Sequence, residues 1–374
     1  MDYYPLAKPY IGKDEERGVL EVLRSGVLSI GPKQAAFEKA FAKFVGVKYA
    51  CAVSSGTAGL HLALIAAGIE PGDEVITSPF SFVASANSIL YVGARPVFAD
   101  IDPVTYNLAP GEIEKKITKR TKAILVVHIF GQSAQMEEIM RIAKRRRLKI
   151  IEDACESVGA KYRGKMVGTF GESGVFAFYP NKQLTSGEGG MIVTNDRKKD
   201  ALFRSLRNQG RAKNRQWLSH ERLGYNYRLD EMSAALALAQ LQRLPFLLRE
   251  RRKIARRYTG FLSRFPALLQ TPVALEGNRH SYFLYVVRLR KGDRDAVIRE
   301  LEREGICARP YFPSIHLLPF YRAQFGFRRG NFPVSEAVSR NALALPFYVG
   351  LTKKDVQYIS RTLVKTLSKH YSLS

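Results

Sequence analysis

Lys182 is the residue whose setting in the sequence best suits chemistry. It follows an apolar segment, residues 174–179, that we expect to be a strand, and Pro180 ends that strand at the start of a glycine-rich loop. A lysine held by rigid backbone beside residues that resist solvation suits an amine that must be neutral and nucleophilic. A single lysine at a strand end can equally be a surface residue, so this interpretation depends on residues elsewhere in the chain.

Two further features of the sequence support a chemical role for Lys182. Asp153 ends the apolar run 149–153, and a buried carboxylate there would need a cationic partner, unless it only caps the helix that follows. Gly56, Thr57 and Ala58 lie in a turn of small residues that opens a predicted helix. Backbone N–H groups at such a turn can bind a phosphate, although the turn could also be an ordinary helix start.

Together these groups match what one cofactor requires. A lysine for an aldehyde, a carboxylate for a pyridinium nitrogen and a helix N-terminus for a phosphate are the groups that pyridoxal 5'-phosphate (PLP) needs. Asp153 and Lys182 follow strands that we expect to be consecutive, so both could lie at one edge of a sheet. Phe82 could stack on the cofactor ring, or could belong to the core.

The elements that would position these residues alternate along the chain. Alternation of strands and helices over this length predicts a mostly parallel sheet covered by helices on both faces. Ligands of such sheets bind beyond the carboxyl ends of the strands. The predicted strands are 49–53, 74–78, 96–99, 123–129, 149–153, 174–179 and 191–194, and the predicted helices are 13–25, 33–45, 57–68, 82–92 and 135–147.

The pattern changes after residue 229, where a long helical stretch begins. We expect a helix that is interrupted at Pro245 and a basic helix that continues to about residue 264. A strand at 282–288, a helix at 293–304 and a last helix after Thr352 complete a smaller α+β unit. The sequence therefore predicts a large α/β domain over 1–245, with the N-terminal segment, and a small domain over 246–374.

The composition favours some functions over others. Fifty-nine Lys and Arg residues stand against 34 Asp and Glu, a net charge of +25. The basic residues are scattered over several helices, and no nucleic-acid-binding motif accompanies them, so solvated helix faces are a better explanation than nucleic-acid binding. Attraction of a nucleotide diphosphate and adaptation to a hot habitat are two further explanations of the charge. Neither a membrane-spanning run nor a secretion signal is expected. Three widely spaced cysteines without metal-site spacing indicate a cytoplasmic protein that binds no metal.

The sequence also resembles a known family. It is similar over residues from about 8 to 360 to the nucleotide-sugar aminotransferases of the DegT/DnrJ/EryC1/StrS group, which are fold-type I PLP enzymes. Each motif alone is weak, but they occur together in the family's order. The motifs are SGTA (55–58), SFVA (81–84), HIFG (128–131), EDACESVGA (152–160), NKQLTSGEGG (181–190), GYNYR (224–228) and the segment 305–316.

The resemblance implies an aspartate-aminotransferase-like fold and roles for the cofactor site. Lys182 matches the Schiff-base lysine, Asp153 the partner of the pyridinium nitrogen and Phe82 the ring-stacking residue. Thr57 and Ala58 match phosphate-binding residues.

Other positions vary among relatives or concern the substrate. Glu156 occupies a position near the cofactor's 3-hydroxyl that often holds Gln or His, and Ala177 replaces a serine that contacts the phosphate in some relatives. Asn226 and Arg228 resemble phosphate contacts from a neighbouring subunit, which implies a homodimer with shared sites. Tyr179, Arg309 and His316 are candidates for the sugar side, or for structural packing.

The resemblance also implies a reaction. An amino group from L-glutamate would pass to a keto carbon of a nucleotide-diphosphate 4-keto-6-deoxy sugar, for polysaccharide or other aminosugar biosynthesis. The segment around Arg309 resembles members that aminate C4 more than those that aminate C3. Relatives that dehydrate the sugar carry His in place of the lysine, so Lys182 speaks against that activity. A PLP-binding regulatory protein without turnover remains an alternative.

Overall fold

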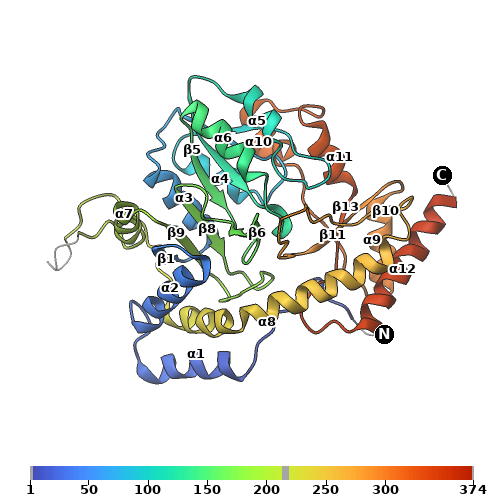
Figure 1. Ribbon diagram of the computed structural model, residues 1–374, viewed down its shortest axis with the longest axis horizontal. Coiled ribbons are helices and arrows are strands. Elements are labelled where there is room, and N and C mark those ends of the chain that lie inside the picture. Colours follow the sequence, from blue (N-terminus) through green and yellow to red (C-terminus); the bar gives the residue numbers. More distant parts are fainter. Residues whose placement is uncertain (1–2, 213–218, 373–374) are drawn as a thin grey trace.

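A mostly parallel sheet forms the centre of the larger part of the protein (Figure 1). The structure is a computed structural model that describes residues 3–212 and 219–372. Within them, the seven-stranded sheet has the order β1-β9-β8-β5-β4-β2-β3, and β9 alone runs antiparallel to its neighbours β1 and β8. The strands are β1 (Tyr49–Val53), β2 (Glu74–Thr77), β3 (Arg95–Phe98), β4 (Thr121–Val127), β5 (Lys149–Asp153), β8 (Ser173–Ala177) and β9 (Gly190–Thr194). The predicted seven-stranded sheet is confirmed.

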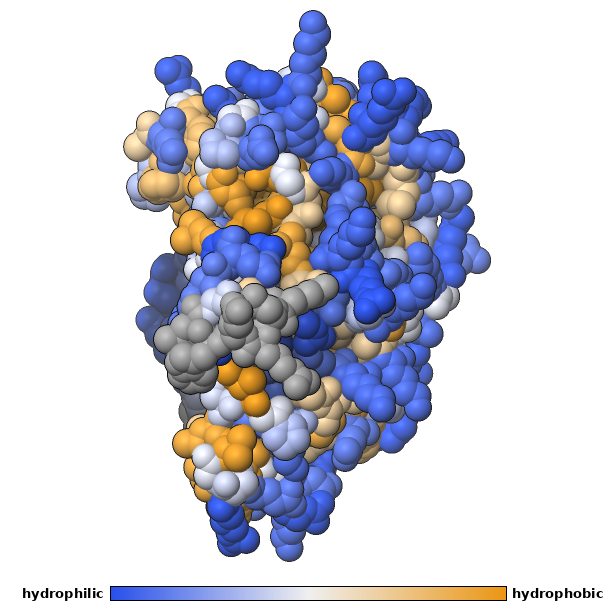
Figure 2. Space-filling view, turned by 90° about the vertical axis from the view of Figure 1, so that its left-hand side faces the viewer, coloured by the Kyte–Doolittle hydropathy of each residue, from blue (hydrophilic) through white to orange (hydrophobic). Residues whose placement is uncertain are grey.

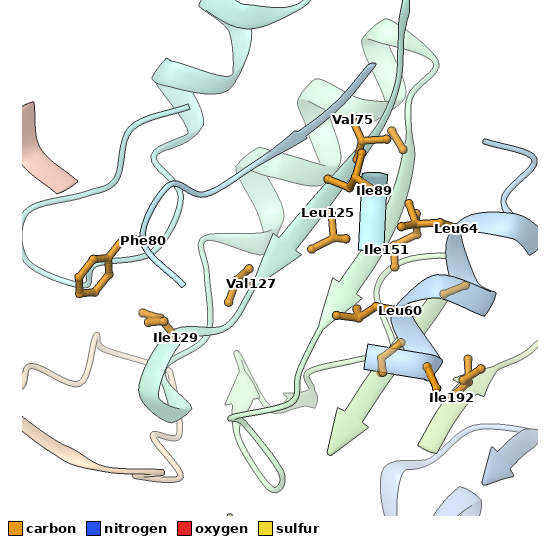
Figure 3. Close-up of a cluster of buried hydrophobic side chains, with 14 of the residues drawn as sticks. Leu60, Leu64, Val75, Phe80, Ile89, Leu125, Val127, Ile129, Ile151 and Ile192 are labelled. Atoms are coloured by element: carbon orange, nitrogen blue, oxygen red, sulfur yellow. The ribbon is translucent and has the colours of Figure 1, made fainter. Parts of the chain in front are cut away.

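Alternate residues of the central strands face two different cores. Leu125 and Val127 of β4 lie in a cluster with Leu60 and Leu64 of α3 (Gly56–Ala66), and Figure 3 shows these side chains between the helix and the sheet. Ile124 and Val126 of the same strand face the opposite core. Each large apolar side chain buried in this way contributes about 1.5–3 kcal/mol, so the sheet is held from both sides.

The five helices predicted for the large part of the protein are observed within two residues of their predicted limits, and the helices at 110–116 and 197–207 were not predicted. For example, α1 ends before Gly26, whose φ of 70° is the left-handed conformation that favours glycine at a helix end. The helices are α1 (Lys13–Ser25), α2 (Pro32–Val45), α4 (Ala84–Tyr91), α5 (Pro110–Lys116), α6 (Met136–Arg146) and α7 (Arg197–Arg207). A short 3-10 helix (Ile129–Gly131) follows β4, and the hairpin β6 (Lys161–Tyr162) and β7 (Lys165–Met166) precedes β8.

A smaller antiparallel sheet forms the second part of the protein. Its strand order is β10 (Leu269–Gln270), β11 (Tyr285–Leu289), β13 (Ala342–Leu345) and β12 (Arg309–Pro310). The helices α9 (Arg294–Arg303), α10 (Pro319–Phe325), α11 (Pro333–Asn341) and α12 (Lys353–Ser372) and a 3-10 helix (Ile315–Leu317) belong to this part. The N-terminal segment also reaches it, because Tyr4 pairs with Ile306.

One long helix joins the two parts. The helix α8 (Glu231–Leu262) runs through Pro245 without a break, so the predicted interruption there is not observed. Its residues 241–248 pack in a core with α2, and its residues 254–262 pack in the core of the small sheet. The change of packing partner thus lies within the helix, and the proposed division at residue 245 remains a prediction.

Among the described residues, no helix has both the length and the apolar character needed to span a membrane.

Candidate active site

The carboxyl ends of three parallel strands meet at one cavity. Asp153, the last residue of β5, pairs in register with Val127 of β4 and Val175 of β8. The chain continues from β8 through residues 178–181 to Lys182, whose backbone N–H donates to the carbonyl of Tyr179. The cavity has a volume of about 630 Å³ and is lined by residues of both the large and the small sheet regions. The predicted approach of Asp153 and Lys182 at one edge of the sheet agrees with this arrangement.

The surroundings of the Lys182 amine are partly charged. Its side chain is 12% exposed, and Nζ lies 3.6 Å from Glu156 Oε1 and 3.9 Å from the centroid of the Phe283 ring. A carboxylate and the face of an aromatic ring both stabilise an ammonium group. The Lys182 amine therefore has an acidic group and an aromatic ring as its neighbours in the wall of the cavity.

Glu156 is the nearest acidic group to that amine. It is 6% exposed, and its Oε2 accepts a hydrogen bond from the backbone N–H of Phe130 at 2.9 Å. Burial raises the pKa of the Glu156 carboxyl, and the nearby Lys182 opposes that rise. This carboxylate can hold the ammonium of Lys182 and can exchange a proton with it.

The Asp153 carboxylate is buried and fixed by hydrogen bonds. The residue is 5% exposed. The backbone N–H of Cys155 donates to Oδ1 at 3.1 Å, and the hydroxyl of Ser85 contacts Oδ2 at 2.7 Å. Because both oxygens already have a fixed partner, the carboxylate faces the cavity in one orientation. Ser85 directly follows the motif at 81–84 but was not among the predicted site residues.

The N-terminus of α3 lies at the same cavity. Ser55 caps the helix by accepting from the backbone N–H of Ala58 at 3.0 Å, so the ordinary helix-start interpretation of this turn is also correct. The first backbone N–H groups of the helix, at Gly56 and Thr57, remain available to an anion. A Cβ atom at Gly56 would lie 2.7 Å from the Cβ of Ala177, so glycine is needed for this close approach.

The remaining predicted residues are divided between the cavity and other places. Phe82 and Tyr179 line the cavity and are 59% and 51% exposed. Arg309 points elsewhere and forms an ion pair with Glu302. His316 is fully buried away from the lining, where its Nε2 lies 3.0 Å from Glu336 Oε1, and burial lowers the pKa of its imidazole. The structure therefore does not bring Arg309 or His316 to the cavity of this chain.

Asn226 and Arg228 also lie outside the cavity of their own chain. Asn226 is exposed and forms a β-bridge with Asn208. The Arg228 guanidinium donates to the side-chain oxygens of Asn208 at 2.9 Å and Gln209 at 3.2 Å. If these two residues contact a cofactor, they reach it in another copy of the chain.

Several lining residues were not among the predicted site residues, although Tyr311, Asn181 and Glu188 lie in the motifs 305–316 and 181–190. Phe283 and Tyr311 come from the second part of the chain and reach the cavity only through the fold. Burial raises the pKa of the Tyr311 hydroxyl to about 12. Asn181 and Glu188 also line the cavity, and the Oδ1 atom of Asn181 is buried without a hydrogen-bond partner. Asn181 could have been found from the sequence, because it directly precedes the predicted lysine.

A third buried carboxylate holds the loop of residues 168–171. Glu152 is fully buried on β5, and it accepts hydrogen bonds from the backbone N–H groups of Gly168, Phe170 and Gly171 at 2.7, 2.6 and 2.8 Å. The imidazole of His128 lies 3.0 Å away and accepts at its other nitrogen from Ala134, so it donates to Glu152.

We expect Glu152→Ala to lower the free energy of unfolding by about 4 kcal/mol, because three backbone N–H groups and the imidazole of His128 would lose their acceptor. Urea denaturation of the purified protein measures this. Glu137→Ala is the matched control, because Glu137 pairs with Arg163 at the surface, and its loss should change stability by less than about 0.5 kcal/mol. Equal stability of the two variants would contradict the prediction.

Comparison with known proteins identifies the family of this chain. The model of the DegT/DnrJ/EryC1/StrS aminotransferase family matches residues 9–364. The chain belongs to this family. The aminotransferase is 43% identical to a GDP-perosamine synthase of Caulobacter vibrioides, over 97% of this chain and 98% of that protein. It is 41% identical to a pleiotropic regulatory protein of Geobacillus stearothermophilus, over 91% and 90% of the two chains.

A solved structure supports the same fold for the aminotransferase. Spr1654 from Streptococcus pneumoniae, solved in its PLP form, has a TM-score of 0.93 and 27% identity, over 98% of this chain and 99% of that one. The aspartate-aminotransferase-like fold predicted from the sequence is thereby confirmed, as is the family itself.

Proposed function

We propose that the protein uses PLP to transfer an amino group from L-glutamate to C4 of a nucleotide-diphosphate 4-keto-6-deoxy sugar. The observation that carries this proposal is the meeting of Lys182, Asp153 and the N-terminus of α3 at one cavity. The similarity to a GDP-perosamine synthase favours a GDP-linked sugar. The three cysteines are free, in keeping with the reducing cytoplasm where we place the enzyme.

The residues at the cavity fit the cofactor. The free N–H groups at the start of α3 and the close approach at Gly56 suit a phosphate, and the buried Asp153 carboxylate suits a cationic ring nitrogen. Phe82 presents an exposed aromatic ring at the same cavity. When bound, PLP supplies an aldehyde for Lys182 and a cationic ring that draws electrons from the α-carbon of the amino donor.

In this arrangement, the protein's own side chains move a proton, hold the amine that carries it and limit the access of water. Lys182 carries the amine that takes a proton from the donor's α-carbon, and its tether at the end of β8 fixes the reach of that amine. Glu156, 3.6 Å away, holds the amine when it is charged. Tyr311 and Phe283 cover the cavity from the second part of the chain, which reduces access of water to Lys182.

The charge of the cavity indicates that a second copy of the chain completes it. Among the residues that line it, Asp153, Glu156 and Glu188 are acidic and Lys182 alone is basic. The cofactor phosphate and the sugar diphosphate are both anions, so further cations are needed. We propose that Arg228 and Asn226 of a second copy supply these contacts in a homodimer. Exposed apolar residues suit such an interface, Leu223 and Tyr91 among them, and Figure 2 shows apolar patches on the face that carries α7.

Mixing two inactive variants tests this shared site. Lys182→Ala and Arg228→Ala, unfolded together and refolded, should regain about one quarter of the wild-type activity, because half of the dimers would be mixed and each would hold one intact site. Each variant refolded alone is the control. Absence of any gain on mixing, with mixed dimers detected by mass spectrometry, would show that Arg228 does not act across the interface.

A substrate screen tests the reaction itself. The purified protein, with PLP and L-glutamate, is incubated with GDP-, dTDP- and UDP-linked 4-keto-6-deoxy sugars, and release of 2-oxoglutarate is measured. We expect the highest kcat/KM with the GDP-linked sugar, and an amino group at C4 of the product by NMR. An amino group at C3 would contradict the proposed position. Cofactor binding without turnover on any of the sugars would instead favour a regulatory role, which the Geobacillus relative's name brings into consideration.

A further inference from the structure

A hydrogen-bonded chain of two serines ends on Asp153. The Ser85 hydroxyl lies 2.7 Å from Asp153 Oδ2, and the Ser81 hydroxyl lies 2.9 Å from that of Ser85. The three residues are 5%, 1% and 4% exposed in the order Asp153, Ser85 and Ser81. Bulk water therefore does not compete for these contacts. Removal of one hydroxyl would leave a buried polar group without its partner, which costs free energy.

The direction of the hydrogen bonds in this chain follows from the charge at its end. An ionised carboxylate can only accept, so the single O–H of Ser85 must donate to Asp153. The bond between the two serines must then be donated by Ser81. Since the backbone N–H of Cys155 donates to the other oxygen, both oxygens of Asp153 accept a fixed hydrogen bond. Bonds in such a chain polarise and strengthen one another.

The same short segment also carries the aromatic residue of the site. Ser81 and Ser85 flank Phe82, and α4 begins between them at Ala84. The hydroxyl of Ser88, one turn further along α4, donates to the backbone carbonyl of Ser85 at 2.9 Å and not to a side chain. One turn of backbone thus sets both the exposed ring of Phe82 and the orientation of the Asp153 carboxylate.

We propose that Ser85 is a positioning residue that sets how strongly Asp153 binds the proton of the cofactor ring nitrogen. A hydrogen bond donated to the ionised form of a carboxylate weakens its affinity for a proton. Ser85 thereby keeps the proton on the ring, and the ring keeps its positive charge and its power to draw electrons. This inference rests on the proposed function, because it requires Asp153 to face a pyridinium nitrogen.

The substitution Ser85→Ala tests the role of this hydroxyl. We expect the dissociation constant for PLP to rise about tenfold, which is the effect of losing one hydrogen bond to a charged group in a buried site. We also expect the visible absorbance of the bound cofactor to change at a higher pH than in the wild type. A ring with less positive charge leaves the nitrogen that joins it to Lys182 more basic.

Three further variants isolate the hydroxyl from other effects of substitution. Ser85→Thr keeps a hydroxyl and should restore both quantities towards the wild type, and Ser81→Ala should shift both in the same direction as Ser85→Ala but less. Ser88→Ala removes an equally buried hydroxyl from the same helix, one that contacts backbone instead of Asp153, and should leave both unchanged.

Failure of this inference and failure of the proposed function would give different results. If Ser85→Ala matches Ser88→Ala in both dissociation constant and absorbance midpoint, Ser85 does not position Asp153 and the inference is wrong. If the wild-type protein, treated with PLP and borohydride and then digested, carries no label on the peptide with Lys182, the proposed function itself is wrong.

Discussion

Replacing Lys182 by alanine is expected to lower the rate of amino transfer from L-glutamate by at least about 10⁴-fold. General base catalysis alone contributes about 10²–10⁴-fold, and the variant also loses the group that bonds covalently to the cofactor. The measurement is a single-turnover assay in which the absorbance of the bound cofactor and the release of 2-oxoglutarate are followed together. Cofactor added in excess keeps the site filled, so the loss would report chemistry and not only binding.

A matched variant separates the role of this amine from the general effect of losing a lysine. Lys199 is also partly buried, at 19% side-chain exposure, but it pairs with Glu172 away from the cavity. Lys199→Ala should therefore keep a rate within about twofold of the wild type, as surface substitutions away from special features do. Normal turnover in Lys182→Ala would remove the base from the proposed mechanism.

The strands of the large sheet could be predicted because their sequence signal is local. The runs that became β1 and β5 are short, apolar and bounded by polar or small residues, and their predicted limits match the structure. The reversed direction of β9 was not predictable, because the pattern of apolar residues is the same for parallel and antiparallel strands buried on both faces. The two-residue strands β6, β7, β10 and β12 are too short to show any periodicity.

Pro245 illustrates how packing overrides a local preference. Proline removes one helical hydrogen bond and usually breaks or kinks a helix, which is why the sequence predicts an interruption. In the structure, buried side chains on both sides of it, Leu244 and Leu247 among them, anchor the helix in one core, and α8 continues to Leu262. Tertiary contacts of this kind leave no mark in the sequence near the proline.

Some residues of the candidate site could be predicted from their local sequence, and others reach the cavity only through tertiary packing. Asp153 ends β5, Gly56 begins α3 and Lys182 lies in the loop that follows β8, so their convergence followed from the expected fold alone. Phe283 and Tyr311 lie more than a hundred residues further along the chain, and only the packing of the two parts brings them to the cavity. His316 was proposed for the sugar side because of its place in a motif, but in the structure it is buried outside the cavity, where it packs on Phe332 and pairs with Glu336.

Asp153→Asn is expected to lower the rate of amino transfer by about 10³-fold, the upper part of the range for loss of one preorganised electrostatic contact in an active site. Asparagine keeps the size of the side chain but cannot carry the negative charge that holds a cationic ring. It also has one accepting oxygen where the structure has two, each of which receives a donor, from Ser85 and Cys155. We therefore also expect the dissociation constant for PLP to rise about 100-fold, because a buried cation would lose its charged partner.

The control for this variant is a buried aspartate that serves a helix instead of the cavity. Asp100 accepts hydrogen bonds from the backbone N–H groups of Val334 and Ser335 at the start of α11, and it does not line the cavity. Asp100→Asn should reduce stability, because it weakens these bonds, while the rate of amino transfer per folded molecule stays within about threefold of the wild type. Asp153→Asn also loses an accepting oxygen and should lower the urea midpoint as well, but its rate of amino transfer per folded molecule should fall far more than threefold. If both variants lose rate only in proportion to the unfolded fraction, the carboxylate of Asp153 acts through stability, and the pyridinium nitrogen has some other partner.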